Sequence, residues 1–338
     1  MTIRDAKTIY ESLKALNLTR AQVRKLLPDW WHPDAEKHAD GIAELCVLIA
    51  RRLSLDVQSL MNGEIRHRSF TTAVAYKHSA DATLQSLQAS TSIATSLAHA
   101  VVASMAIPYS GIGALPEVFA AMAREAGDGV VGLSSLVETC WSVGVPVIPI
   151  PNLPVGIRKM DGAVIRVGDR PAIIISKKKS SRAWLAFIVA HEIGHIGCGH
   201  LEREGSIIDV SLQEQATYET ESSSDTEERE ADGYALELLG GAGVGLEIEG
   251  WPEWASPVDL AVRAREKAHE LGVESGHLIL RYAFQTKRWP DSMAALRFLS
   301  EDADAEALMK SILSRNLNLD LVADDIRDLV CKITGIND

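Results

Sequence analysis

Two short motifs in this chain contain the residue types of a metal-dependent hydrolase. The pentapeptide HEIGH at residues 191–195 places two histidines four residues apart, and EREAD at residues 228–232 begins 33 residues after the second histidine. On an α-helix, positions four apart are offset by only ~40° around the axis, so two imidazoles at this spacing can bind one cation. We therefore expect His191 and His195 to be metal ligands.

A third ligand is expected from the EREAD segment. Zinc in hydrolases is usually held by three protein groups, and a distant glutamate commonly completes a His-Glu-x-x-His pair. Glu228 suits this role because Asp232, four residues later on the same helical face, can accept the second ring N–H of a ligating histidine and fix its tautomer. Glu230 is the alternative ligand, since both glutamates lie in one acidic run.

Glu192 has the position of a catalytic base rather than of a ligand. It lies ~100° round the helix from His191, beside the expected cation. Zinc lowers the pKa of a bound water to ~7, so a neighbouring carboxylate can take the proton and later pass it to a leaving amine. The expected chemistry is amide hydrolysis with Zn²⁺ as the cofactor, although manganese or iron also accepts such mixed donors.

A structural alternative is a pair of core histidines satisfied by hydrogen bonds. The context favours the metal site, because the apolar run at residues 183–190 predicts a buried helix that carries both histidines into a core. Gly194, Gly197 and Gly199 then allow a partner backbone to come close and the helix to end. His200, which follows Gly199, is expected beyond the helix and outside the site.

The elements around these motifs predict an α+β fold. Runs of β-branched residues at 145–150, 162–167 and 172–176 predict a small sheet beside the zinc helix. Helices are expected on either side of this region, at residues 6–16, 19–27 (with Thr19 as N-cap), 41–53, 80–105, 258–271 and 275–285. We expect three domains: a helical one at 1–110, the metallopeptidase domain at 111–250 and a helical one at 251–338.

The motifs and their surroundings resemble the ImmA/IrrE metallopeptidases over roughly residues 112–245. The resemblance rests on GVPVI at 144–148, MDGAVI at 160–165, AIIIS at 172–176, AHEIGH at 190–195 and the Glu-x-x-Ala-Asp helix that continues to residue 239. One departure is the aspartate at position 232, where these proteins usually carry asparagine. The resemblance implies a zincin-like core, with His191, His195 and Glu228 as ligands and Glu192 as the catalytic residue.

The resemblance also implies a substrate class. Members of the family are associated with zinc-dependent cleavage of helix-turn-helix repressors, so we expect a regulatory protein as the substrate and partner. Residues 45–63 resemble the closing helices of a phage-repressor-type helix-turn-helix, so the alternative is a DNA-binding regulator with a sensory or structural metal site. Residues 1–110 hold 12 basic and 10 acidic residues, which is weak support for DNA binding. An interaction scaffold with a vestigial site is a third possibility.

Composition is that of a cytoplasmic globular enzyme. The chain has 338 residues, of which 46% are hydrophobic and 24% charged, and no apolar run reaches the ~18 residues that cross a bilayer. The N-terminus lacks the pattern of a secretory signal. The four cysteines are scattered without a Cys-x-x-Cys pair, so no disulfide framework is expected. Cys198 could reach the metal, but its pattern favours a small buried hydrophobe.

Several neighbouring segments could influence substrate binding. Residues 201–250 hold 14 acidic and 2 basic side chains, a balance of −12, and residues 203–226 are expected to form a polar surface connection near the cleft. The lysines at 177–179 could steer an acidic substrate, although a solvated turn is the simpler interpretation. Tyr218 and Tyr234 are candidate donors to a developing oxyanion.

Overall fold

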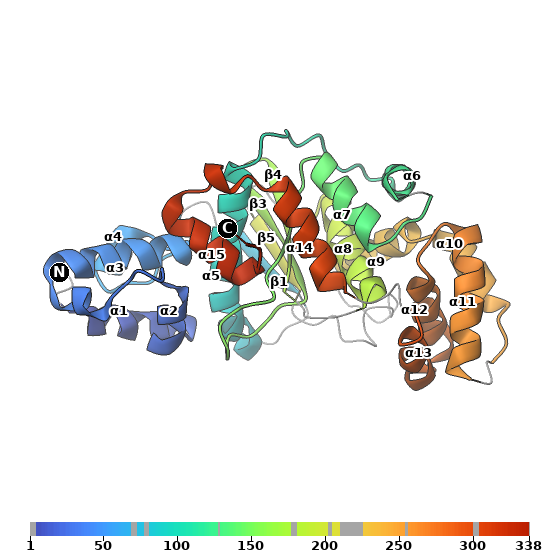
Figure 1. The fold of residues 1–338 in the computed structure, drawn as a ribbon, viewed down its shortest axis with the longest axis horizontal. Helices are drawn as coiled ribbons and strands as arrows, with labels where there is room; N and C mark the ends of the chain where they lie inside the picture. Colours follow the sequence, from blue (N-terminus) through green and yellow to red (C-terminus); the bar gives the residue numbers. More distant parts are fainter. Residues whose placement is uncertain are drawn as a thin grey trace.

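The computed structural model describes residues 5–68, 73–77, 81–127, 129–176, 181–201, 205–209, 226–253, 256–299 and 304–337. A mixed sheet lies at the centre and helices surround it (Figure 1), which confirms the α+β class. The lysines at 177–179 and Tyr218, for which roles near the cleft were expected, lie outside the described residues.

The sheet has five strands in the order β1-β5-β3-β4-β2. The antiparallel pair β3 and β4 forms its centre, with β5 antiparallel to β3, β2 parallel to β4 and β1 parallel to β5. The strand bounds are Ala73–Lys77 (β1), Val147–Pro149 (β2), Gly162–Val167 (β3), Arg170–Ile175 (β4) and Gly205–Asp209 (β5). The three expected strands correspond to β2, β3 and β4.

Two strands were not expected from the sequence. β1 lies inside the block expected to be helical, and β5 lies inside the segment at 203–226 expected to be a surface connection. Both are five residues long and stand among polar residues, so they show too few apolar positions to give a period-2 pattern. Their pairing with each other and with β3 extends the sheet on one side.

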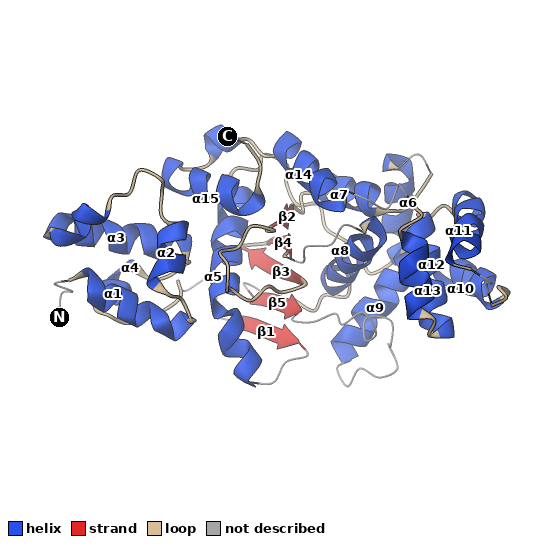
Figure 2. Cartoon of the chain, turned by 60° about the horizontal axis from the view of Figure 1, so that its bottom comes forward, coloured by secondary structure: helices blue, strands red, loops and turns tan. Residues whose placement is uncertain are grey.

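Two long helices cover opposite faces of this sheet (Figure 2). α5 (Asp81–Ala103) contacts β3 and β4 from one side, and α8 (Arg182–Gly197) contacts the same strands from the other. α8 begins after Ser181, whose hydroxyl accepts the N–H of Trp184, and all its residues from Ala183 to Ile196 are buried. The predicted buried helix is therefore confirmed, and α9 (Thr226–Leu238) lies alongside it.

The N-terminal helices form a separate layer beside α5. Thr19 and Gln22 make a capping box at the start of α2, which confirms the expected N-cap. The expected helix at 6–16 is an α-helix followed by a 3₁₀ turn. The bounds are Ala6–Ser12 (α1), Leu13–Leu16 (the 3₁₀ turn η1), Arg20–Leu26 (α2), Pro33–Lys37 (the 3₁₀ turn η2), Ala39–Arg52 (α3) and Val57–Met61 (α4).

Helices after the sheet form two groups. α10 to α13 lie together at one end of the molecule, whereas α14 contacts α7 and β2, and α15 contacts α3 and α5 (Figure 1). The bounds are Pro116–Ala126 (α6), Leu133–Ser142 (α7), Gly241–Glu249 (α10), Pro257–Leu271 (α11), Ser275–Thr286 (α12), Trp289–Leu296 (α13), Ala305–Asn316 (α14), Leu319–Leu321 (the 3₁₀ turn η4) and Asp324–Thr334 (α15). Elements therefore pack together across both expected boundaries, at 110 and at 250.

A buried arginine connects the N-terminal helices to the end of the chain. The side chain of Arg52 at the end of α3 is 1% exposed and pairs with the carboxylate of Asp328 on α15. Its guanidinium also donates to the backbone carbonyls of Leu26 and Asp325. In the described part of the chain, no helix has the length and apolar character needed to cross a membrane.

Candidate metal centre

The two motif histidines meet at one point on α8. The Nε2 atom of His191 lies 3.0 Å from the Nε2 atom of His195, and both side chains are completely buried. The two rings stand nearly perpendicular, with centroids 4.7 Å apart. The four-residue spacing thus brings two imidazole nitrogens together, as predicted.

Glu228 on α9 completes a group of three metal-ligating side chains. Its Oε2 lies 3.4 Å from Nε2 of His191, and its Oε1 lies 3.4 Å from Nε2 of His195. The donor atoms of the three residues all lie within 4.8 Å of one another, and all three residues are buried. Within the described ranges, this is a group that could hold a metal ion.

The chemistry of this donor set fits a divalent cation. Two imidazole nitrogens that face each other at 3.0 Å repel through their lone pairs unless a cation or a proton lies between them. A neighbouring carboxylate contributes the negative charge that a cation requires when it is buried. Two histidines and one glutamate are a ligand set found in zinc hydrolases, where one coordination position remains for water or substrate.

A close helix crossing holds the two motifs together. A Cβ atom on Gly194 would lie 2.7 Å from the backbone oxygen of Ala231 and 2.9 Å from its Cα atom. The backbone of α9 therefore occupies the space that any larger residue at position 194 would need. Gly194 in one motif and Ala231 in the other have to be small because the two helices touch at this point.

Asp232 is in contact with the first of the two histidines. Its Oδ1 lies 2.8 Å from Nδ1 of His191, and the carboxylate is buried. Because a carboxylate accepts hydrogen bonds, the ring hydrogen of His191 is on Nδ1, and its Nε2 presents a lone pair toward Glu228. The four-residue spacing from Glu228 to Asp232 thus brings both carboxylates to the same histidine.

Glu230 faces a different partner. Its Oε2 lies 2.9 Å from Nε2 of His200, and its side chain is 55% exposed. The Nδ1 atom of His200 in turn lies 2.9 Å from Nδ1 of His195. The structure thus places Glu228 in the histidine cluster and Glu230 outside it, and it brings His200, which was expected outside the site, into contact with a candidate ligand.

The end of α8 accounts for the position of His200. Gly199 has a left-handed backbone (φ 76°), its N–H donates to the carbonyl of Ile196, and the N–H of His200 donates to the carbonyl of His195. These two bonds define a Schellman motif, in which the residue after the glycine folds back over the last helical turn. The glycine at 199 was the sequence signal that could have identified His200.

Glu192 lies against the first strand residue of β3. Its side chain is completely buried. The carboxylate occupies the position that a Cβ atom on Gly162 would take, so position 162 cannot carry a side chain without moving Glu192. The candidate base is thus held between α8 and the sheet.

Two further sequence expectations have a clear outcome. Cys198 is exposed, not buried as expected, because it follows the last residue of α8. Its pKa is raised by partial burial and by the charge of Glu230. The hydroxyl of Tyr234 donates to the backbone carbonyl of Gly113 at 2.9 Å, and burial raises its pKa.

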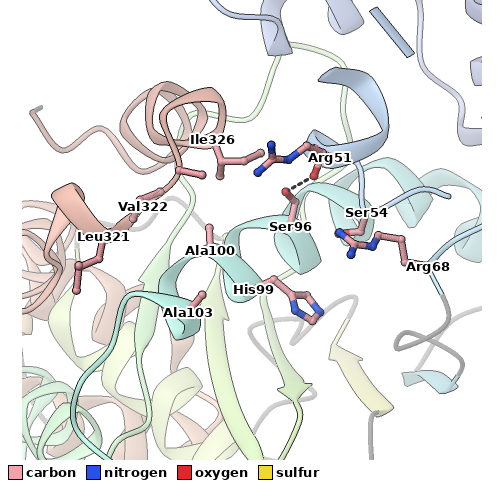
Figure 3. A pocket seen from close by; sticks show the side chains of 11 residues that line it. Arg51, Ser54, Arg68, Ser96, His99, Ala100, Ala103, Leu321, Val322 and Ile326 are labelled. Atoms are coloured by element: carbon pink, nitrogen blue, oxygen red, sulfur yellow. Dashed lines mark hydrogen bonds between the residues drawn. The ribbon is translucent and has the colours of Figure 1, made fainter. Parts of the chain in front are cut away.

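A pocket of about 350 Å³ lies on the other side of the sheet, where α3 and α5 meet the segment before α15. Figure 3 shows Arg51, Arg68 and His99 along one side of it and apolar side chains such as Ile326 along the other. Arg51 is paired with Asp325 at 2.8 Å. Burial, with a contribution from the charge of Arg68, lowers the pKa of His99 to about 4.

Comparison of the sequence with protein-family models gave no match, and comparison with curated proteins gave none either.

Proposed function

We propose that this chain is a cytoplasmic zinc-dependent endopeptidase of the ImmA/IrrE type. The observation that carries the proposal is the convergence of His191, His195 and Glu228, whose donor atoms lie within 4.8 Å of one another. Glu192, the fourth residue of the proposed site, is buried on the same helix as the two histidines. A divalent cation bound there would supply Lewis acidity to a peptide carbonyl.

Each residue of the site has a distinct role in this proposal. Glu192 takes a proton from the attacking water and delivers it to the nitrogen of the leaving amine, which is general base and then general acid catalysis. Asp232 accepts the Nδ1–H of His191 and so keeps that ring in the tautomer that can bind a cation. The buried position of the three ligands excludes bulk water from all sides except that of the substrate.

The proposed substrate is a regulatory protein, in the first place a helix-turn-helix repressor. Support comes from the family resemblance, since the match covers the two motifs and the strands between which they lie. The N-terminal helices α1 to α4 then serve in recognition of the partner or of its DNA. Their position in a layer of their own beside α5 leaves them available for such contacts.

Profiling of protein N-termini in cells tests this proposal whatever the sequence of the substrate is. Cells producing the natural protein are expected to show new N-termini that are missing in cells producing Glu192→Gln. The variant protein should retain a stoichiometric metal ion, because Glu192 is not a ligand, and elemental analysis checks this. Identical N-terminal profiles for the two proteins, with zinc bound to both, would overturn the proposed function.

A further inference from the structure

The end of the zinc-helix candidate α8 brings together three side chains in a row: His195, His200 and Glu230. The Schellman motif at Gly199 folds His200 back over the last turn of α8, and Glu230 reaches the far side of its ring from α9. The two contacts of His200, to Nδ1 of His195 and to Oε2 of Glu230, are both 2.9 Å long. The side chain of His200 is 5% exposed, so the ring is held within the protein.

We propose that His200 and Glu230 are positioning residues for the metal ligand His195. This inference rests on the proposed metal centre. In it, His200 transmits the hydrogen-bonding requirement of a surface carboxylate to a buried histidine, and so presents Nε2 of His195 to the cation. A direct carboxylate contact performs the same task for the other ligand, His191.

The positions of the ring hydrogens follow from one end of this row. A carboxylate only accepts, so Nε2 of His200 carries a hydrogen and donates it to Glu230. In the neutral ring, Nδ1 of His200 is then an acceptor, and Nδ1 of His195 must be the donor. The remaining nitrogen of His195, Nε2, therefore has a lone pair directed toward His191 and Glu228.

The row explains two features that the metal ligands alone leave without a reason. Glu230 is two residues from Glu228, ~200° away around α9, so it cannot share the ligand position. Its placement beside His200 gives that carboxylate a structural role. The glycine at 199 likewise does more than end the helix, because a left-handed residue there brings His200 over His195.

The test measures metal affinity rather than catalysis. Zn²⁺ binding is determined by competition with a chromophoric chelator, and the bound site is examined by the visible absorption of Co²⁺-loaded protein. His200→Ala is expected to weaken Zn²⁺ binding about 10- to 100-fold, the usual effect of losing an outer hydrogen-bond partner of a ligand. The Co²⁺ spectrum should change as well, because the ring of His195 is no longer fixed.

A set of matched variants separates positioning from general destabilisation. His200→Asn retains an acceptor at the place of Nδ1, so its affinity should lie closer to that of the natural protein than the affinity of His200→Ala. Glu230→Gln should weaken binding by a smaller factor and should have no further effect in the His200→Ala background. Glu227→Gln, which removes the same charge from the same helix, should leave the affinity unchanged.

The outcomes distinguish this inference from the proposed function. Equal Zn²⁺ affinities and equal Co²⁺ spectra for the natural protein, His200→Ala and His200→Asn would overturn the inference and leave the peptidase standing. Metal binding that depends on His200, without any cleavage in cells, would overturn the peptidase and support the inference. A natural protein that binds no divalent ion would overturn both.

Discussion

The Nδ1 atom of His191 lies 2.8 Å from Oδ1 of Asp232, with both groups buried between α8 and α9. This contact fixes the hydrogen of the ring on Nδ1 and leaves Nε2 to face Glu228. The helix that carries the candidate third ligand thus also supplies the residue that orients the first. Metal binding and the packing of the two helices are therefore coupled.

Replacement of Asp232 by alanine is expected to weaken Zn²⁺ binding about 10- to 100-fold, because His191 loses its acceptor. Asp232→Asn should have a smaller effect, since the amide oxygen can accept the same hydrogen. Chelator competition on the purified proteins measures both. Unchanged affinity in Asp232→Ala would contradict the orienting role.

Gly194→Ala should separate α8 from α9, because the added methyl group would meet the backbone of Ala231. We expect a loss of about 1–3 kcal/mol in the free energy of unfolding, as for other overpacked sites, together with weaker metal binding. Chemical denaturation of the metal-free proteins measures the first effect. Gly233→Ala on α9 is the control: its methyl group meets nothing within 4 Å, so a gain of about 0.5–1 kcal/mol is expected there.

Gly162→Ala should displace the carboxylate of Glu192 and leave the three candidate ligands in place. The expected result is a loss of proteolysis with an unchanged metal content, measured by N-terminal profiling and by elemental analysis. Gly113→Ala is a suitable control because a methyl group there has nothing within 4 Å. A Gly162→Ala protein that cleaves as the natural one does would show that Glu192 tolerates the shift or is not the base.

The metal-free protein should lose stability as the pH falls below about 6.5. Burial, with a contribution from the charge of Arg281, lowers the pKa of His277 to about 3, while burial and Arg68 lower that of His99 to about 4. Between these values and ~6.5 the unfolded chain binds protons that the folded protein does not, so each histidine reduces the free energy of unfolding by up to ~1.4 kcal/mol per pH unit.

His277→Met tests this origin of the pH dependence. Removal of the buried imidazole should flatten the decline between pH ~6.5 and about 4, when the variant is compared with its own stability at about pH 7.5. Denaturant titrations in the presence of a chelator measure the slope without a contribution from metal loss. An equally steep decline in His277→Met would assign the effect to other groups.

The histidines of the site were predictable because a helix converts a four-residue spacing into one direction. The same rule favoured Glu228 over Glu230, since only Glu228 is in phase with Asp232, and the positions of the two carboxylates agree with it. His200 was missed because its contact depends on a chain reversal, and a helical wheel ends where the helix ends. The Gly199 signal was present but was interpreted only as a stop.

The sheet was predictable only where its strands are apolar. β3 and β4 have buried, β-branched runs that are typical of strands, whereas β1 and β5 gain their regularity from backbone pairing with other parts of the chain. Such long-range pairing has no local signature. The same limitation applies to α14 and α15, whose return to β2 and α3 is a matter of tertiary contacts.

The parallel pairing of β1 with β5 means that the metallopeptidase region cannot be excised as an independent piece. A fragment that begins at residue 111 would lack β1 and α5, which would leave β5 as an unprotected edge and uncover the face of β3 and β4 against which α5 packs. An open edge next to uncovered apolar surface promotes aggregation. Any exchange of recognition modules between such chains would therefore have to occur before residue 73, upstream of the first strand.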